Sequence, residues 1–138
     1  MTVFHSFTCQ TRGFSDVHNI TDEIQSCLES SGIDNGIAVI SVPGSTASIT
    51  TIEYEPGVIE DLKKAVERLA PRDMHYDHDA RWGDGNGFAH VRAALLGPSI
   101  AVPVKNKKLI LGTWQQIILI DFDNRSRRRE IAVQIVGD

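Results

Sequence analysis

Hydrophobic and polar positions alternate along the first ten residues. Between Val3 and Gln10, every second position carries one of the less polar side chains, namely Val3, His5, Phe7 and Cys9. A period of two is typical of a β-strand that buries one face. The pattern therefore predicts a half-buried strand at the start of the chain.

Three later segments have the spacing of amphipathic helices instead. The first begins at Thr21 and ends at Gly32, a residue suited to a helix C-cap, and its apolar stripe is Ile24, Cys27 and Leu28. The second begins at Pro56, because proline is favoured in the first helical turn, and its stripe is Val58, Leu62, Ala65, Val66 and Leu69. The third is a short helix over residues 88–96 that Gly97 and Pro98 close.

Runs of β-branched and apolar residues predict the remaining strands. Residues 36–42 and 49–54 are separated by a turn at Pro43 to Thr46, so we expect them to form an antiparallel pair. Four more strands, at residues 100–104, 109–111, 114–122 and 131–136, predict a C-terminal meander. The polar segment over residues 72–87 is predicted to be a functional loop, because its Trp, His and Asp content argues against disorder.

Together these elements favour an α+β fold. Strands without regular helical crossovers predict a largely antiparallel β-sandwich, with two to three helices packed on it. A chain of 138 residues is long enough for one core, so residues 1–138 are expected to form a single domain. No glycine-rich nucleotide-binding loop follows a strand, which argues against a dinucleotide-binding fold.

Composition and charge narrow the class of protein. The formal net charge of -4 argues against a general nucleic-acid-binding surface. No apolar stretch is long enough to cross a bilayer and the first residues do not form a secretion signal, so we expect a cytoplasmic protein that makes no use of a membrane. Cys9 and Cys27 lack metal-binding spacing and are expected to be reduced, structural residues.

A basic run stands out against this acidic background. It consists of Arg125, Arg127, Arg128 and Arg129. Arginine clusters of this kind bind phosphate groups on small ligands. An equally good interpretation is a charged turn and edge strand that discourages aggregation. Because side chains alternate along a strand, Arg127 and Arg129 share one face.

The segment from Tyr76 to His90 has the highest density of chemically active side chains. It contains His78, Asp79, Trp82, Asp84, Asn86 and His90. If the intervening loop folds back, both imidazoles reach one metal ion or one substrate, and the neighbouring oxygen atoms complete or orient the site. A histidine pair satisfied by loop backbone is the structural alternative.

Two further clusters contain polar residues of functional types. Hydroxyl residues follow Gly44 and precede Glu53, and they either bind an anion or form a turn and a Thr-rich edge strand; we favour the turn. The sequence GTWQQ at residues 112–116 opens a long strand. Its Trp114 is expected to anchor the core more often than to serve as a stacking platform.

Ordered blocks of the sequence resemble the YjbQ-like family, which is named for a secondary thiamine-phosphate synthase activity. The matching blocks span nearly the whole chain and are STASITTIE at 45–53, YDHD at 76–79, DGNGFAH at 84–90, LLGPS at 95–99, LGTWQ at 111–115 and VQIVG at 133–137. The resemblance implies a compact fold with a β-sandwich and a homotrimer. It also implies a polar pocket near a subunit interface that holds a divalent metal, with zinc the first choice.

The resemblance also implies roles for individual residues. His78 and His90 are expected to be metal ligands, and to be catalytic together with Asn86 and Glu53. The expected substrate-binding residues are Thr46, Asp84, Thr113, Trp114, Gln115, Arg127 and Arg129. Relatives often have histidine where this chain has Gly44. A three-histidine metal site is therefore not assumed, and a carboxylate or water would complete the metal shell.

The implied reaction joins a pyrimidine diphosphate to a thiazole phosphate and releases pyrophosphate. Such a reaction needs cations or a metal to stabilise the leaving diphosphate. Arg127 and Arg129 are predicted to hold that group, with His78 and His90 acting as acids or metal ligands. The alternative is a non-catalytic homotrimer that binds a metal or a phosphorylated metabolite.

Overall fold

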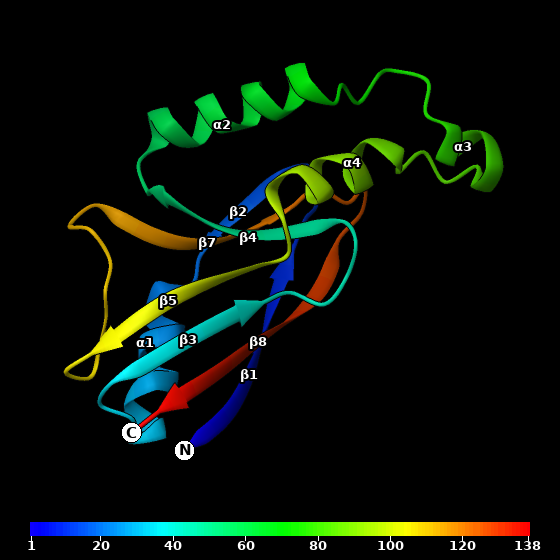
Figure 1. Cartoon of the computed structure of the whole chain (residues 1–138). Coiled ribbons are helices and arrows are strands. Elements are labelled where there is room, and N and C mark those ends of the chain that lie inside the picture. The colour runs from blue at the N-terminus through cyan, green and yellow to red at the C-terminus, as the bar shows by residue number, and fades with distance from the viewer.

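The computed structural model describes all 138 residues, and two antiparallel sheets form its centre (Figure 1). The larger sheet has the order β1-β8-β3-β5-β6 and consists of β1 (Thr2–Thr11), β8 (Arg127–Gly137), β3 (Gly36–Ser41), β5 (Ser99–Lys105) and β6 (Lys108–Leu109). The smaller sheet has the order β2-β7-β4 and consists of β2 (Asp16–Asn19), β7 (Gln115–Asp121) and β4 (Ala47–Glu53). The predicted α+β class with antiparallel sheets is confirmed.

Four helices accompany the sheets. They are α1 (Thr21–Ser31), α2 (Pro56–Leu69), α3 (Asp77–Trp82) and α4 (Gly87–Leu96). In Figure 1, α2, α3 and α4 lie together on the side of the smaller sheet, whereas α1 packs against β1 and β8 of the larger sheet. None of the helices is both long enough and apolar enough to cross a membrane.

The smaller sheet is buried on both faces, and β7 shows this most clearly. Ile117 and Leu119 point into the core shared with α1 and the larger sheet. Ile120 and Phe122 pack instead with apolar residues of α2 and α4. A strand that is covered on both faces needs apolar side chains at successive positions, which explains the continuous run IILI in place of an alternating pattern.

Local sequence signals determine the helix ends as predicted. Gly32 closes α1 with a φ of 73°, a conformation that costs glycine little. Pro56 occupies the first turn of α2, and the Glu55 carboxylate accepts hydrogen bonds from the backbone N–H groups of Gly57 and Val58. These bonds satisfy donors that a helix N-terminus otherwise leaves unpaired.

The predicted pairing of residues 36–42 with residues 49–54 is wrong. Strand β3 pairs with β5 and β8 in the larger sheet, whereas β4 pairs with β7 in the smaller one. The turn from Pro43 to Thr46 carries the chain from one sheet to the other. Gly44 in this turn has a φ of 134°, which residues with a Cβ atom rarely adopt.

The predicted C-terminal meander is also wrong. Only β5 and β6 form a hairpin, while β7 joins the smaller sheet and β8 returns to the larger sheet between β1 and β3. The segment predicted as a loop over residues 72–87 contains α3, which brings the helices to four in place of the expected two to three. Turn residues mark where a chain bends, but they do not specify which sheet it joins next.

Candidate functional site

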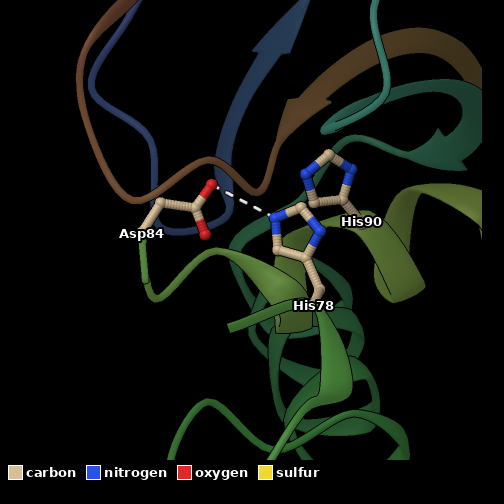
Figure 2. Close-up of side chains that lie close together, drawn as sticks. All are labelled: His78, Asp84 and His90. Atoms are coloured by element: carbon tan, nitrogen blue, oxygen red, sulfur yellow. Dashed lines mark hydrogen bonds and ion pairs between the residues drawn. The ribbon is translucent and has the colours of Figure 1, made fainter. Parts of the chain in front are cut away.

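Two histidines from neighbouring helices meet near the start of β4. His78 lies on α3 and His90 on α4, and their ring centroids are 4.4 Å apart with planes inclined by 49°. Figure 2 shows Asp84 beside them, with its Oδ2 atom 3.1 Å from His78 Nε2. One ligand atom from each of these three residues lies within 4.8 Å of the others. The structure thus brings together the imidazole pair that the sequence singled out, and we call these three residues the histidine cluster.

Backbone geometry shapes the loop that carries Asp84 between α3 and α4. Gly83 and Gly85 have φ values of 68° and 66°, so the chain reverses on both sides of Asp84. The Asp79 carboxylate accepts a hydrogen bond of 2.9 Å from the backbone N–H of Gly87 at the start of α4. Asp79 is therefore engaged in holding the two helices together.

The electrostatics of the histidine cluster suit a cation. A hydrogen bond from His78 lowers the pKa of Asp84 below its ordinary value, because it stabilises the carboxylate form. The side chain of Asp84 is half-exposed, and both histidines are partly exposed. A carboxylate and two imidazoles therefore converge at a place that solvent ions can reach.

A depression of about 210 Å³ lies beside His90. Its walls include Gly44 from the turn before β4, Ala47 at the start of β4, and Ala93 and Ala94 from α4. Position 44, where the resemblance implies a third imidazole, therefore borders the same space as His90. A Cβ atom added to Gly44 would lie 3.0 Å from the Arg129 guanidinium, so glycine avoids a close contact with that buried side chain.

Asp121 and Asp123, two buried carboxylates where β7 ends, connect several segments of the chain, and we call them the carboxylate pair. Asp121 accepts two hydrogen bonds from Arg129, at 2.7 and 2.9 Å, and a third from Thr11 at 2.6 Å. All of these side chains are buried. A bidentate arginine–carboxylate pair is both strong and directional, so this contact ties β7 of the smaller sheet to β1 and β8 of the larger one.

Asp123 connects the same region to the loop of the histidine cluster. Its Oδ2 atom accepts hydrogen bonds from Thr46 at 2.9 Å, Asn86 at 3.2 Å and Arg127 at 3.1 Å. Burial alone would raise the pKa of Asp123, but these hydrogen bonds outweigh it and lower the pKa below the ordinary value. The carboxylate is therefore held in its charged form.

These contacts account for four of the predicted site residues. Thr46, Asn86 and Arg129 are buried, and the Arg129 guanidinium is directed at Asp121 and Thr46. Arg127 pairs with the carboxylate pair as well, but 36% of its side chain remains exposed. A diphosphate group does not reach Arg129 without breaking a buried ion pair, whereas Arg127 presents an accessible edge.

The remaining predicted residues lie at the opposite end of the smaller sheet. Glu53 pairs with Gln115 six positions along β4 from Ala47, a separation of about 20 Å for an extended strand. Glu53, Thr113 and Trp114 line an open pocket of about 410 Å³ at that end. The residues predicted to form one site therefore fall into two groups within the chain.

Trp114 does not anchor the core as the sequence suggested. Its side chain is 73% exposed, and Tyr54 beside the same pocket is 43% exposed. Gln115 is used locally, because its amide group bonds to Thr51 and to the backbone of Gly112. Two exposed aromatic rings at one end of a sheet form an apolar surface of the kind that contacts other molecules.

The residues that organise this region were not predicted from the sequence. Asp121 and Asp123 flank Phe122 at the end of an apolar run, and charged residues at that position look like the start of a solvated turn. Arg92 is also buried, in the middle of the apolar helix α4. The sequence signal for these residues is a charged side chain next to or within an apolar run, because a charge that is buried there needs a charged or hydrogen-bonding partner.

Comparisons with known proteins agree with one another. A family model described as UPF0047 protein YjbQ-like matches residues 5–138. The chain is 38% identical over 124 residues to a UPF0047 protein of Archaeoglobus fulgidus, which covers 90% of this chain and 94% of that protein. It is 36% identical over 120 residues to UPF0047 protein YugU of Bacillus subtilis, with coverage of 86% and 88%.

Solved structures share the fold over its whole length. A YbjQ-like protein of unknown function from Sulfolobus solfataricus has a TM-score of 0.94 at 34% identity, and the match covers 100% of this chain and 99% of that one. An uncharacterized YjbQ/UPF0047 protein from Clostridium acetobutylicum has a TM-score of 0.88 at 32% identity, with coverage of 96% and 99%. The arrangement of sheets and helices described above is therefore shared with experimentally solved proteins.

Replacing Arg129 with alanine should lower the free energy of unfolding by about 3–5 kcal/mol, because it leaves Asp121 buried without its charge partner. Arg128→Ala is the matched control, since Arg128 is exposed on the opposite face of β8, and we expect a change within about 0.5 kcal/mol. Urea unfolding followed by circular dichroism measures both values. Equal destabilisation by the two substitutions would contradict a structural role for the Asp121–Arg129 pair.

Proposed function

The chain belongs to the YjbQ-like UPF0047 family, and we propose that it binds a divalent metal ion, with zinc the first choice, through His78, Asp84 and His90. We infer further that the bound metal serves a small phosphorylated molecule. The observation that carries this proposal is the approach of two imidazoles and a carboxylate from three segments to within 4.8 Å. Two free cysteines, Cys9 and Cys27, support a location in the reducing cytoplasm.

The donor set of the histidine cluster fits zinc. Catalytic zinc sites commonly have three nitrogen or oxygen ligands and leave one position to water or substrate. In a tetrahedral site with bonds of about 2.0–2.1 Å, the donor atoms lie roughly 3.4 Å apart. His78 Nε2 and Asp84 Oδ2 are already 3.1 Å apart. The three side chains are partly exposed, so they can rotate to bring the remaining donor atoms, now within 4.8 Å of one another, to the same separation. The depression beside His90 leaves room for a ligand next to the cluster.

The finer proposal is thiamine-phosphate synthase activity, which joins a pyrimidine diphosphate to a thiazole phosphate with release of pyrophosphate. A divalent metal would supply positive charge to the leaving diphosphate. His78, Asp84 and His90 would hold that charge in place, and the exposed edge of Arg127 would add a further cation. Asn86 would have a positioning role, because its hydrogen bond to Asp123 holds the loop that precedes α4.

The alternative is a non-catalytic protein that binds a metal or a phosphorylated metabolite. One observation favours it: Arg129 is buried against Asp121, and Arg127 is paired with Asp123. Few unpaired cations therefore accompany the histidine cluster, whereas expulsion of a diphosphate needs strong charge stabilisation. Both readings use the same metal site, and they differ in whether substrates turn over.

Zinc binding tests the shared part of the proposal. Removing one of three ligands in His90→Ala should weaken zinc affinity by roughly 100-fold or more, since loss of an outer-shell partner alone costs 10–100-fold. His75→Ala is the matched control, because His75 is 77% exposed and lies outside the cluster. Isothermal titration against a zinc-buffering chelator measures both affinities. Equal zinc binding by the two variants would rule out the histidine cluster as the metal site.

Turnover separates the two candidate functions. Zinc-loaded protein given both thiamine precursors should form thiamine phosphate and release pyrophosphate, and His90→Ala should lose this activity while His75→Ala keeps it. Chromatography of the product, together with a pyrophosphate assay, follows the reaction. Zinc binding without product would support the binding-protein alternative, and full activity in His90→Ala would contradict the catalytic site.

We also propose that the chain assembles as a homotrimer. Glu53 lies about 20 Å along β4 from Ala47, which borders the depression beside His90, and Thr113 lines the same pocket as Glu53. This separation is too large for Glu53 and His90 to contact the same small ligand within one chain. The exposed rings of Trp114 and Tyr54 give that end of the sheet an apolar surface. If this surface of one subunit borders the histidine cluster of the next, both groups of predicted residues contribute to one site.

Light scattering after size-exclusion chromatography tests this assembly. The protein should have a mass three times that of the 15.2 kDa chain. Trp114→Ala should shift the mass toward the monomer, because it removes the largest exposed ring of the proposed surface. Trp82→Ala, which replaces an equally exposed tryptophan on α3, should remain trimeric. A monomeric unmodified protein, or equal behaviour of the two variants, would contradict the proposal.

A further inference from the structure

A second pocket is lined by residues of α2, of α4 and of the turn between β1 and β2. His90 and Arg92 are two positions apart on α4, which places their side chains about 200° apart around the helix. Arg92 lines a pocket of about 200 Å³ together with Phe14, Ser15, Lys63, Arg72 and Phe88. We call this space the α2–α4 pocket, and it shares no residue with the histidine cluster.

Arg92 is a fixed part of this pocket. Its side chain is buried, and its guanidinium donates to the carbonyl of Ala70 at 3.0 Å and to Ser15 Oγ at 3.3 Å, and pairs with Glu67. A serine hydroxyl that accepts a hydrogen bond still has a proton to donate. The Ser15 proton has no acceptor within the chain, so it is free to bond to a ligand in the pocket.

Two other cations at the pocket retain free donors. The Arg72 guanidinium has no carboxylate partner and stacks over the Phe14 ring, 4.2 Å from its centroid. Stacking on an aromatic face holds a guanidinium in place and leaves its in-plane N–H groups available to an anion. Lys63 has one weak contact, to Glu60 at 3.7 Å on the surface of α2. With Glu67 as the single lining carboxylate, the pocket is a positive site in a protein of net charge -4.

The turn that supplies Phe14 and Ser15 has an unusual backbone. Gly13, Phe14 and Ser15 have φ values of 77°, 54° and 65° in succession, a region that residues with side chains avoid. Hydrogen bonds of 2.8 Å from the Phe14 and Ser15 N–H groups to the carbonyls of Asp123 and Asp121 hold this conformation. The strained turn leaves the Phe14 ring 44% exposed at the pocket, where it contributes little to the core.

We propose that the α2–α4 pocket binds a small organic anion, in which a carboxylate or phosphate monoester is attached to a flat apolar group. The charged group bonds to Arg72 and Lys63 and accepts the Ser15 hydroxyl proton. The apolar group packs against Phe14 and Phe88. The volume of the pocket is below the ~300–1,000 Å³ of typical drug-sized sites, which restricts the ligand to a small metabolite. This binding site goes beyond the proposed metal-dependent function.

Titration of the full chain with phenyl phosphate and with benzoate tests this proposal. These probes share one ring and differ in the charged group, so the tighter probe identifies the group that the pocket prefers. Amide NMR shifts report where each probe binds. We expect saturable shifts at the turn of Phe14 and Ser15 and around Lys63, Arg72 and Arg92, with at least one of the two probes.

Matched variants locate the charge that is responsible. Arg72→Ala should weaken probe binding by roughly tenfold, the value of one charge-assisted hydrogen bond. Arg68→Ala removes an exposed arginine of α2 outside the pocket and should change the affinity by no more than about twofold. His90→Ala should also leave probe binding unchanged, which separates this site from the metal site. Absence of shifts at these amides with both probes at millimolar concentration, or equal affinities of Arg72→Ala and Arg68→Ala, would overturn the proposal.

Discussion

The buried carboxylate pair where β7 leaves the smaller sheet is the constraint on which the rest of the structure depends. An ionised carboxylate inside a protein is costly unless hydrogen-bond donors surround it. Asp121 takes its donors from β1 and β8, and Asp123 takes its donors from the turn before β4, the residue before α4 and the first residue of β8. Four segments, around Thr11, Thr46, Asn86 and the start of β8, are therefore held at the end of β7, which joins the two sheets and the helical layer.

The same constraint decides where the histidine cluster forms. Asn86 is anchored to Asp123 and directly precedes α4, so it fixes the start of the helix that carries His90. Thr46 is anchored to the same carboxylate and fixes the turn that borders His90 on its other side. Many buried ion pairs can be replaced by apolar residues with no loss of stability. The carboxylate pair is therefore better explained by the positions it imposes than by the energy it contributes.

The sequence predicted elements that depend on neighbouring residues and failed for those that depend on distant ones. Helix α2 was predictable because Glu55, Pro56 and its apolar stripe act within a few turns. Strand pairing was not predictable from the sequence, because the turns after β3 and β7 each lead from one sheet to the other. No residue near these turns specifies which sheet the next strand joins. Alternation correctly placed Arg127 and Arg129 on one face, but the burial of Arg129 depends on Asp121, which lies on a different sheet. The histidines were found through residue density and family resemblance, because a separation of twelve positions has no geometry of its own.

The two halves of the histidine cluster differ in how firmly the protein holds them. Helix α4 is packed on the core through Phe88, Ala89 and Ala93, so His90 projects from a rigid support. Helix α3 has six residues and buries none of them, and a few hydrogen bonds hold it and the following loop. Short exposed segments of this kind open at low free-energy cost. Under the proposed metal binding, we therefore expect His78 and Asp84 to move toward a stationary His90 until the three donor atoms fit one ion. Such binding would order α3 and leave the fold of the sheets unchanged.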